Sequence, residues 1–233
     1  MLRTISPLLV LASFATLVGC STTEIVNRKD SSHTFTTVVV DAGHGGKDSG
    51  ASRRYGPPEK SATLDVAQRL NRKLQAAQFR TVMTRSSDVF IPLDQRVAIG
   101  NREDNSIFVS VHFNDSGRRK MHGVETYYAS PYARALAQRI QSKLTGSGAR
   151  NRGVKTANFR VIRNATYPAV LVECGFLSNR AEGREAGSVA YREMLAAKIT
   201  EAILEERRGF SGTEIRTAAA GNAGSGVAGA QAR

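Results

Sequence analysis

A short apolar strand that runs into a glycine-rich turn is encoded by Val38-Val39-Val40-Asp41-Ala42-Gly43-His44-Gly45-Gly46. Three consecutive valines bounded by such a turn are typical of a strand that is buried on both faces. The glycines allow the backbone to turn sharply and leave space around the side chain of His44. This stretch therefore predicts a buried sheet with a histidine at its edge.

Strand and helix patterns alternate along the rest of the chain. Apolar residues recur at helical spacing over 61–78, and further helices are predicted at 93–102, 131–144 and 189–208. Further strands are predicted at 80–84, 106–111, 123–129, 159–162 and 169–172. Alternation of this kind is typical of an α/β fold. We expect a single domain over 36–209, with a twisted, mostly parallel central sheet and helices on both faces.

Four polar side chains stand where these predicted elements begin or end. His44 and His112 each follow a strand, Glu173 closes another strand, and Glu59 precedes the long helix. In open α/β sheets, sites gather at the carboxyl ends of the strands. If the strands are parallel neighbours, His44, His112 and Glu173 converge on one edge. A zinc hydrolase needs three protein ligands, one open position for water and a base, and these residues supply that set.

Each of these residues also has an ordinary structural interpretation. Alone, His44 would be a loop histidine bound to the backbone, and Glu59 would be a carboxylate that favours a helix N-terminus. His112 would be satisfied by a polar neighbour such as Asn114. Glu173 differs, because it follows four apolar residues and burying a carboxylate is costly unless it is paired. It is the candidate general base, which takes a proton from water and passes it to the departing amine.

Cys174 is a rival candidate, as a nucleophile. A thiol needs a histidine base, which His44 or His112 could supply. However, Cys174 directly follows Glu173 on a predicted strand, so its side chain points to the opposite face. We expect a buried small hydrophobe instead. With only two cysteines in the chain, no disulfide framework is indicated.

The N-terminal residues 1–19 have the pattern of a lipoprotein signal peptide. An apolar run follows Arg3, and the segment ends in Leu17-Val18-Gly19-Cys20, which resembles the lipobox of bacterial lipoproteins. We expect lipidation at Cys20, which attaches the chain to a membrane, followed by a flexible tether over 20–35. By resemblance to the sorting rules of such lipoproteins, Ser21 favours the outer membrane, on its periplasmic side. An ordinary signal peptide with an incidental cysteine is the alternative.

The composition of the C-terminal tail indicates that it lies outside the folded domain. Residues 210–233 are rich in Gly and Ala, and cannot bury enough surface to offset the entropy of ordering them. We therefore expect them to be disordered.

The net charge of +13 favours an acidic partner, either nucleic acid or the acidic peptides of a cell wall. The absence of Trp and an aromatic content of 6% argue against a stacking platform for single strands, and an exported protein seldom meets nucleic acid.

Taken together, these segments resemble the zinc-dependent N-acetylmuramoyl-L-alanine amidases of the amidase type 3 family. The resemblance covers about residues 36–207 and rests on 38–48, Glu59, 84–101, 110–114 and 168–179. It implies Zn²⁺ held by His44, Glu59 and His112, with Glu173 as the catalytic carboxylate. It also implies cleavage of the amide between the lactyl group of N-acetylmuramic acid and L-alanine in peptidoglycan.

The sequence also bears on regulation and on substrate binding. Only about sixty residues separate His112 from Glu173, so the inserted inhibitory helix of division-associated family members is not expected. Control would then come from tethering, substrate access or another envelope protein. Asn114, Arg118 and Arg119, with Lys120, are the candidate binding residues for the free carboxylates of stem peptides. A solvated surface loop is the alternative for the three basic residues.

Two other functions remain compatible with these residues. One is a zinc peptidase that acts within the stem peptide. In such enzymes the first ligand pair usually lies a few residues apart, whereas His44 and Glu59 are fifteen apart. The other is a non-catalytic wall-binding lipoprotein, which has no need for all four polar residues.

Overall fold

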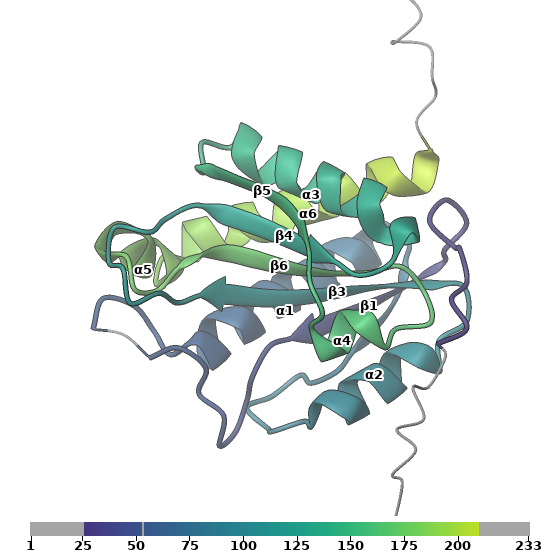
Figure 1. Cartoon of the computed structure of the whole chain (residues 1–233), viewed down its shortest axis with the longest axis horizontal. Coiled ribbons are helices and arrows are strands. Elements are labelled where there is room, and N and C mark those ends of the chain that lie inside the picture. The colour runs from purple at the N-terminus through teal and green to yellow at the C-terminus, as the bar shows by residue number, and fades with distance from the viewer. Residues whose placement is uncertain (1–25, 53, 210–233) are drawn as a thin grey trace, which may run out of the picture.

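The computed structural model describes residues 26–52 and 54–209, which form a sheet between two layers of helices (Figure 1). The sheet has six strands in the order β2-β1-β3-β6-β4-β5, and all neighbours are parallel except the antiparallel pair β4 and β6. The strands are β1 (Thr37–Ala42), β2 (Arg80–Met83), β3 (Ser106–Asn114), β4 (Val124–Tyr128), β5 (Asn151–Thr156) and β6 (Ala169–Phe176). The predicted α/β fold with a mostly parallel sheet is confirmed.

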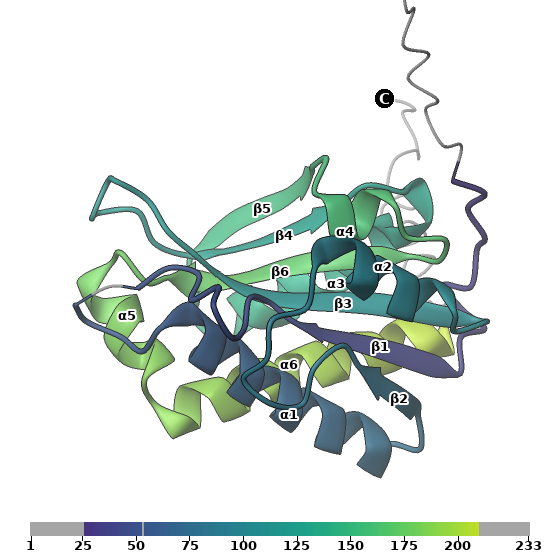
Figure 2. The same cartoon turned by 90° about the horizontal axis from the view of Figure 1, so that it is seen from below.

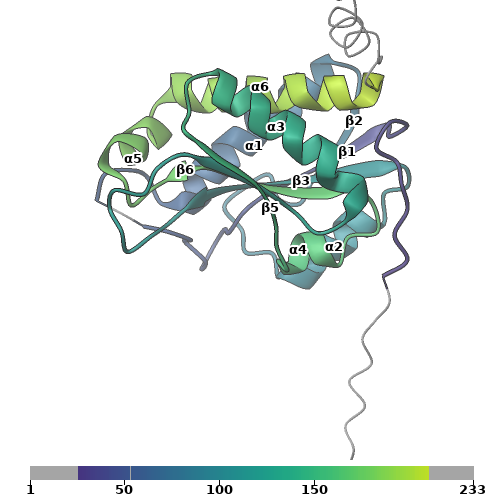
Figure 3. The ribbon, with the colours of Figure 1, turned by 45° about the horizontal axis from the view of Figure 1, so that its top comes forward.

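Helices lie on both faces of this sheet (Figures 2 and 3). One layer contains α1 (Glu59–Ala76), α3 (Arg134–Gly146) and α6 (Val189–Arg208), and α6 packs against the other two. The opposite layer contains α2 (Leu93–Asn101) and the single turn α4 (Arg160–Arg163), which pack against each other. The short elements η1 (Pro131–Ala133) and α5 (Arg180–Ala186) precede α3 and α6.

Strand β1 contributes to two separate cores, which explains its uninterrupted valines. Val38 and Val40 belong to the larger core, beneath α1, α3 and α6. Val39 belongs to the smaller core on the other face, together with Phe108 and Leu171. Successive side chains of a strand point to opposite faces, so a strand covered on both sides needs apolar residues at every position.

The predicted elements differ from the structure mainly at the end of the sheet that contains β5. Residues 159–162, predicted as a strand, lie at the start of α4, where Val161 and Ile162 are buried in the smaller core. Strand β5 was not predicted, because its sequence Asn-Arg-Gly-Val-Lys-Thr lies at the sheet edge and needs few apolar residues. Strand β6 continues past Glu173 to Phe176 instead of ending at Glu173.

Part of the predicted tether packs against the domain. The side chain of Phe35 is fully buried and stacks on Phe79, with ring centroids 5.5 Å apart. Ser31 donates a hydrogen bond to the carbonyl of Ser106 at 2.6 Å. The packed chain therefore begins before the expected boundary at Thr36. The predicted signal peptide over 1–19, the predicted lipidation site Cys20 and the tail over 210–233 lie outside the described residues.

Within 26–52 and 54–209, every helix is too short or too polar to cross a membrane.

Candidate metal centre

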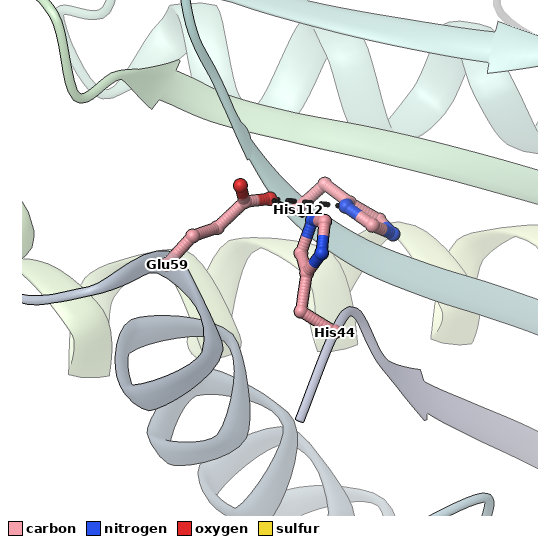
Figure 4. A group of neighbouring side chains, drawn as sticks. All are labelled: His44, Glu59 and His112. Carbon is pink, nitrogen blue, oxygen red and sulfur yellow. Dashed lines mark hydrogen bonds and ion pairs between the residues drawn. The ribbon is translucent and has the colours of Figure 1, made fainter. Parts of the chain in front are cut away.

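Strand pairing brings the predicted ligands to one edge of the sheet. Strands β1 and β3 pair with Ala42 opposite Val111, so the turn after β1 lies beside His112. His112 in turn lies opposite Glu173 on β6. Glu59 is the first residue of α1 and points toward both histidines (Figure 4). His44, Glu59 and His112 each offer one ligand atom, and these atoms lie within 4.8 Å of one another.

Glu59 is the shared partner of the two imidazoles. Its Oε1 lies 3.0 Å from His44 Nε2 and 3.0 Å from His112 Nδ1. The backbone N–H of Phe113 also donates to Oε1, at 3.1 Å, and that of Ala51 donates to Oε2 at 2.9 Å. Burial opposes the charged form, but the two histidines hold the pKa of Glu59 well below its ordinary value. Glu59 is therefore an ionised carboxylate at a site that is only 4% exposed.

The orientation of His44 is set by Asp48. The Nδ1 of His44 lies 2.9 Å from Asp48 Oδ2, which leaves Nε2 directed at Glu59. A carboxylate on the outer nitrogen is the usual support for a metal-binding histidine, because it fixes the tautomer and the ring orientation. The two imidazoles meet edge to face, with centroids 5.0 Å apart.

Glycines make the space in which these side chains meet. A Cβ on Gly43 would lie 2.3 Å from the His112 ring. Gly50 has a φ of +61°, and a Cβ there would lie 2.6 Å from both Glu59 Oε2 and the His44 ring. Both positions therefore require glycine for steric reasons. His44 itself has a φ of 60°, a conformation that is uncommon for a non-glycine residue and that needs support from its surroundings.

Two buried arginines give that support by binding the carbonyl groups of the turn. Arg85 donates to the carbonyls of Ala42 at 2.9 Å and Gly43 at 2.7 Å. Arg96 donates to the carbonyl of His44 at 2.6 Å and to Asp41 Oδ1 at 2.8 Å. Asp41 also accepts hydrogen bonds from the hydroxyls of Thr84 and Ser110, each at 2.6 Å. The turn is therefore fixed by a charged network under the first ligand.

Glu173 lies beside the ligands with unused hydrogen-bonding capacity. Its Oε2 is buried and has no hydrogen-bond partner in the structure. Burial raises the pKa of Glu173 to about 7, although the positive charge of His112 opposes this shift. A carboxyl group with a pKa near neutrality is suited to both accepting and donating a proton.

A cleft of about 520 Å³ opens over His44, His112 and Glu173. Its wall includes three apolar side chains. Phe90 precedes α2, Leu93 is the first residue of α2, and Phe159 directly precedes α4. These three side chains are 40%, 53% and 42% exposed, so the cleft has an apolar rim beside a polar floor. The arrangement can hold a substrate over the metal ligands while keeping Glu173 within the site.

The predicted binding residues lie apart from this cleft. Asn114 directs its amide nitrogen toward Glu125 Oε2, at 3.5 Å. Arg118 and Arg119 are exposed in the loop after β3. Arg119 contributes to a second hollow with Lys120 and the α5 residues Arg180 and Arg184. The structure thus brings together the predicted ligands and Glu173, and places the basic residues on a neighbouring surface.

Cys174 lies in the larger core and is fully buried. Burial raises the pKa of its thiol far above neutrality, so the group stays protonated. It also lies on the face opposite Glu173, as predicted from the alternation of side chains along a strand.

Sequence reasoning assigned no role to several residues of the site. Asp48 and Arg96 lie inside the segments 38–48 and 84–101, on which the family resemblance rests, and Asp48 stands four positions after His44, within reach of its ring. Their support roles depend on how the turn folds. The apolar rim of the cleft could not be recognised from the sequence, because isolated exposed apolar residues are common on protein surfaces.

An α/β sheet with two imidazoles, one carboxylate and a second, unpaired carboxylate at its carboxyl edge defines a class of metal-dependent hydrolases. The family model for N-acetylmuramoyl-L-alanine amidase, Amidase_3, matches residues 38–205. The chain therefore belongs to this family.

Individual relatives agree with the family match. The chain is 37% identical over 182 residues to the N-acetylmuramoyl-L-alanine amidase LytC of Bacillus subtilis. The aligned region covers 76% of this chain and 36% of LytC. It thus spans about a third of the length of that relative. Among solved structures, the catalytic domain of the amidase CwlV from Bacillus (Paenibacillus) polymyxa superposes with a TM-score of 0.68 at 36% identity, covering 72% of this chain and 96% of CwlV's domain. The amidase AmiC2 of Nostoc punctiforme gives 0.70 at 35% identity, with 72% and 94% covered.

Proposed function

We propose that this chain hydrolyses the amide between the lactyl group of N-acetylmuramic acid and L-alanine in peptidoglycan, with zinc as its metal. The observation that carries the proposal is the convergence of His44, Glu59 and His112 beside the unpaired Glu173 in an open cleft. The bond that is cut and the class of substrate are inferred from the chain's membership of the amidase family.

The donor set fits zinc. Two imidazole nitrogens and one carboxylate oxygen are ligands that Zn²⁺ prefers, and three protein ligands leave a position for water. One negative charge among the ligands would leave the centre positively charged. Zinc bound there would lower the pKa of water and polarise the carbonyl group of the amide.

Glu173 moves the proton. It accepts a proton from the attacking water at a carboxylate oxygen, while the oxygen of that water bonds to the carbonyl carbon of the lactyl group. When the carbon–nitrogen bond breaks, Glu173 delivers the proton to the departing nitrogen of L-alanine. The products are a lactyl carboxylate on the glycan and a peptide with a free amino terminus. The buried, unpartnered Oε2 is the atom suited to this task.

The remaining residues hold the site in this geometry. Asp48 keeps the outer nitrogen of His44 occupied, and Arg96 fixes the carbonyl of the same residue. Gly43 leaves the space that the His112 ring fills. Rigid positioning of this kind matters because a small displacement of a reacting group lowers the rate strongly.

The substitution Glu173→Gln tests the proton-transfer role. It keeps the shape of the side chain and removes the base, so kcat should fall by about a thousandfold, within the range known for general acid–base catalysis. Zinc content and binding to purified peptidoglycan should stay at the wild-type level. Retention of most of the activity would show that another group acts as the base, and a wild-type chain that binds the wall without cleaving it would support the non-catalytic alternative.

We also propose that the chain is a lipoprotein of the outer membrane, attached through Cys20. The support is the lipobox-like Leu17-Val18-Gly19-Cys20 and the serine that follows it. The same proposal includes the signal peptide over 1–19 and a lipidated N-terminus. Cys20→Ala should abolish incorporation of a labelled fatty acid and release the protein from the membrane fraction. Labelling that persists in this variant would contradict the proposal.

The position of α3, the longest helix between His112 and Glu173, supports activity without an activator. Helix α3 packs against α6, in the layer on the far side of the sheet from α2 and α4. We therefore propose that residues 21–233 are active when purified and loaded with metal. A strict requirement for a second protein would contradict this.

A further inference from the structure

A second carboxylate, Glu125, lies next to Glu173 on the metal side of the sheet. Strands β4 and β6 are antiparallel, and Glu125 is paired directly with Glu173. Residues directly opposite in such a pair project from the same face. Glu125 is only 2% exposed, and a buried carboxylate is costly unless cations or hydrogen bonds compensate it.

Glu125 is compensated by two cations from the edge strand β5. Its Oε1 binds Nε of Arg152 and lies 3.0 Å from Nζ of Lys155. Its Oε2 accepts a hydrogen bond from the hydroxyl of Tyr127. One carboxylate therefore holds two positive groups, which leaves this cluster with one positive charge in excess.

The excess charge is accessible. The side chain of Lys155 is 41% exposed and that of Arg152 is 20% exposed, whereas that of Glu125 is 3% exposed. In Figure 1, the helices α2 and α4 lie over the lower strands of this face, and β4 and β5 lie above them.

An aromatic path connects these cations to the cleft over the metal ligands. Phe159 lines the cleft and packs edge to face on Tyr127, with centroids 5.2 Å apart. Lys155 Nζ lies over the same Tyr127 ring, 5.8 Å from its centroid. A chain that extends from an amide at Glu173 toward β5 would therefore reach Lys155 and Arg152.

We propose that Arg152 and Lys155, held in place by Glu125, form a subsite for a carboxylate of the stem peptide next to the cleaved amide. The inference rests on the proposed function, because it takes the amide at Glu173 as the point from which the peptide extends. A guanidinium and an ammonium group bind carboxylates through charge-assisted hydrogen bonds, and the uncharged sugar offers no such partner. The peptide then lies along β4 and β5, and the sugar lies toward the apolar rim of Phe90 and Leu93.

The test is binding of a product peptide, which needs no turnover. The probes are L-alanyl-D-glutamate and the same dipeptide with both carboxyl groups amidated, titrated into the metal-loaded chain and followed by NMR. The wild type should bind the acid about tenfold more tightly than the amide, since a hydrogen bond to a charged group contributes on that order. Lys155→Ala should remove most of this preference, while Arg152 still pairs with Glu125 and circular dichroism shows that the variant is folded at the temperature of the titration.

Lys198→Ala is the matched control, because Lys198 is a similarly exposed lysine on α6 that pairs with Glu201. It should retain the wild-type preference. Equal binding of both probes by the wild type, or an unchanged preference in Lys155→Ala, would overturn the subsite. A chain that shows the preference but cleaves no muropeptide would instead contradict the proposed function, so the two failures are distinguishable.

Discussion

Two segments follow neighbouring parallel strands at the same edge of the sheet, yet they are built differently. The metal turn, residues 43–50, follows β1 and is held by Arg85, Arg96 and glycines that fit closely against the ligands. The basic loop, residues 115–123, follows β3 and exposes Arg118 and Arg119. A Cβ on Gly117 in this loop would meet nothing within 4 Å. The ligand positions are therefore set by buried contacts, whereas the basic loop has room for a larger side chain at Gly117 and exposes its arginines to solvent.

The largest expected difference between the two segments is in stability. Arg96 and Asp41 form an ion pair at 2.8 Å with side chains 3% and 1% exposed. Arg96→Met leaves a buried carboxylate without its cation, so the free energy of unfolding should fall by about 3–5 kcal/mol in a urea titration. Arg119→Met in the basic loop should change it by less than about 0.5 kcal/mol. Similar small changes in both variants would remove the distinction.

Buried charge also predicts a pH effect at Glu173, for the chain stripped of metal by a chelator. The pKa of Glu173 is raised from 4.5 to about 7, so folding favours its protonated form. The resulting stabilisation is fully present below pH 4.5 and is lost as the pH rises through about 7. At pH 8, Glu173→Gln should therefore exceed the wild type by about 3 kcal/mol in unfolding free energy, and the two should converge near pH 4.5. A difference that does not depend on pH would contradict this.

A glycine pair compares the two segments with the same chemical change. Gly43→Ala places a methyl group 2.3 Å from the His112 ring, so that ring must move. The affinity for zinc should fall by about 10–100-fold, as for other changes that displace a ligand, and competition with a chromogenic chelator measures it. Gly117→Ala should leave zinc affinity unchanged. Equal losses would mean that the turn tolerates displacement.

The smallest expected effect is that of the basic loop on substrate. Replacing Arg118, Arg119 and Lys120 with glutamine should weaken binding to intact peptidoglycan by about two- to fivefold, in line with the small contribution of exposed charges. Hydrolysis of a small soluble muropeptide should keep its rate. Cosedimentation with purified wall and a peptide-release assay separate the two quantities, and parallel losses in both would place the loop in the active cleft.

The contrast between buried and exposed positions also explains which features could be predicted from the sequence. Val38 to Val40 and the apolar run before Glu173 identify buried strands, because their environment requires apolar residues on both faces. His44 and His112 follow from the edge that parallel strands share. Glu59 begins a helix, and its place between the histidines came from the family resemblance, since helix N-terminal charge explains it equally well.

Other features depend on long-range packing, which a local pattern does not contain. Strand β5 is an edge strand with a polar sequence, and α4 is a single turn whose Val161 and Ile162 also suit a strand. Glu125 alternates with buried residues on β4 as an ordinary exposed glutamate would. Its charge is compensated in the buried site by Arg152 and Lys155. Both residues lie on β5, a strand that could not be predicted from the sequence.

The most direct test of the central claim is the identity of the bond that is cut. Purified muropeptides are incubated with the zinc-loaded chain over residues 21–233, and the products are identified by mass spectrometry. We predict peptides that begin with L-alanine, together with glycan that retains the lactyl carboxylate. Peptides that begin with any other residue, or muropeptides that remain intact, would contradict the account.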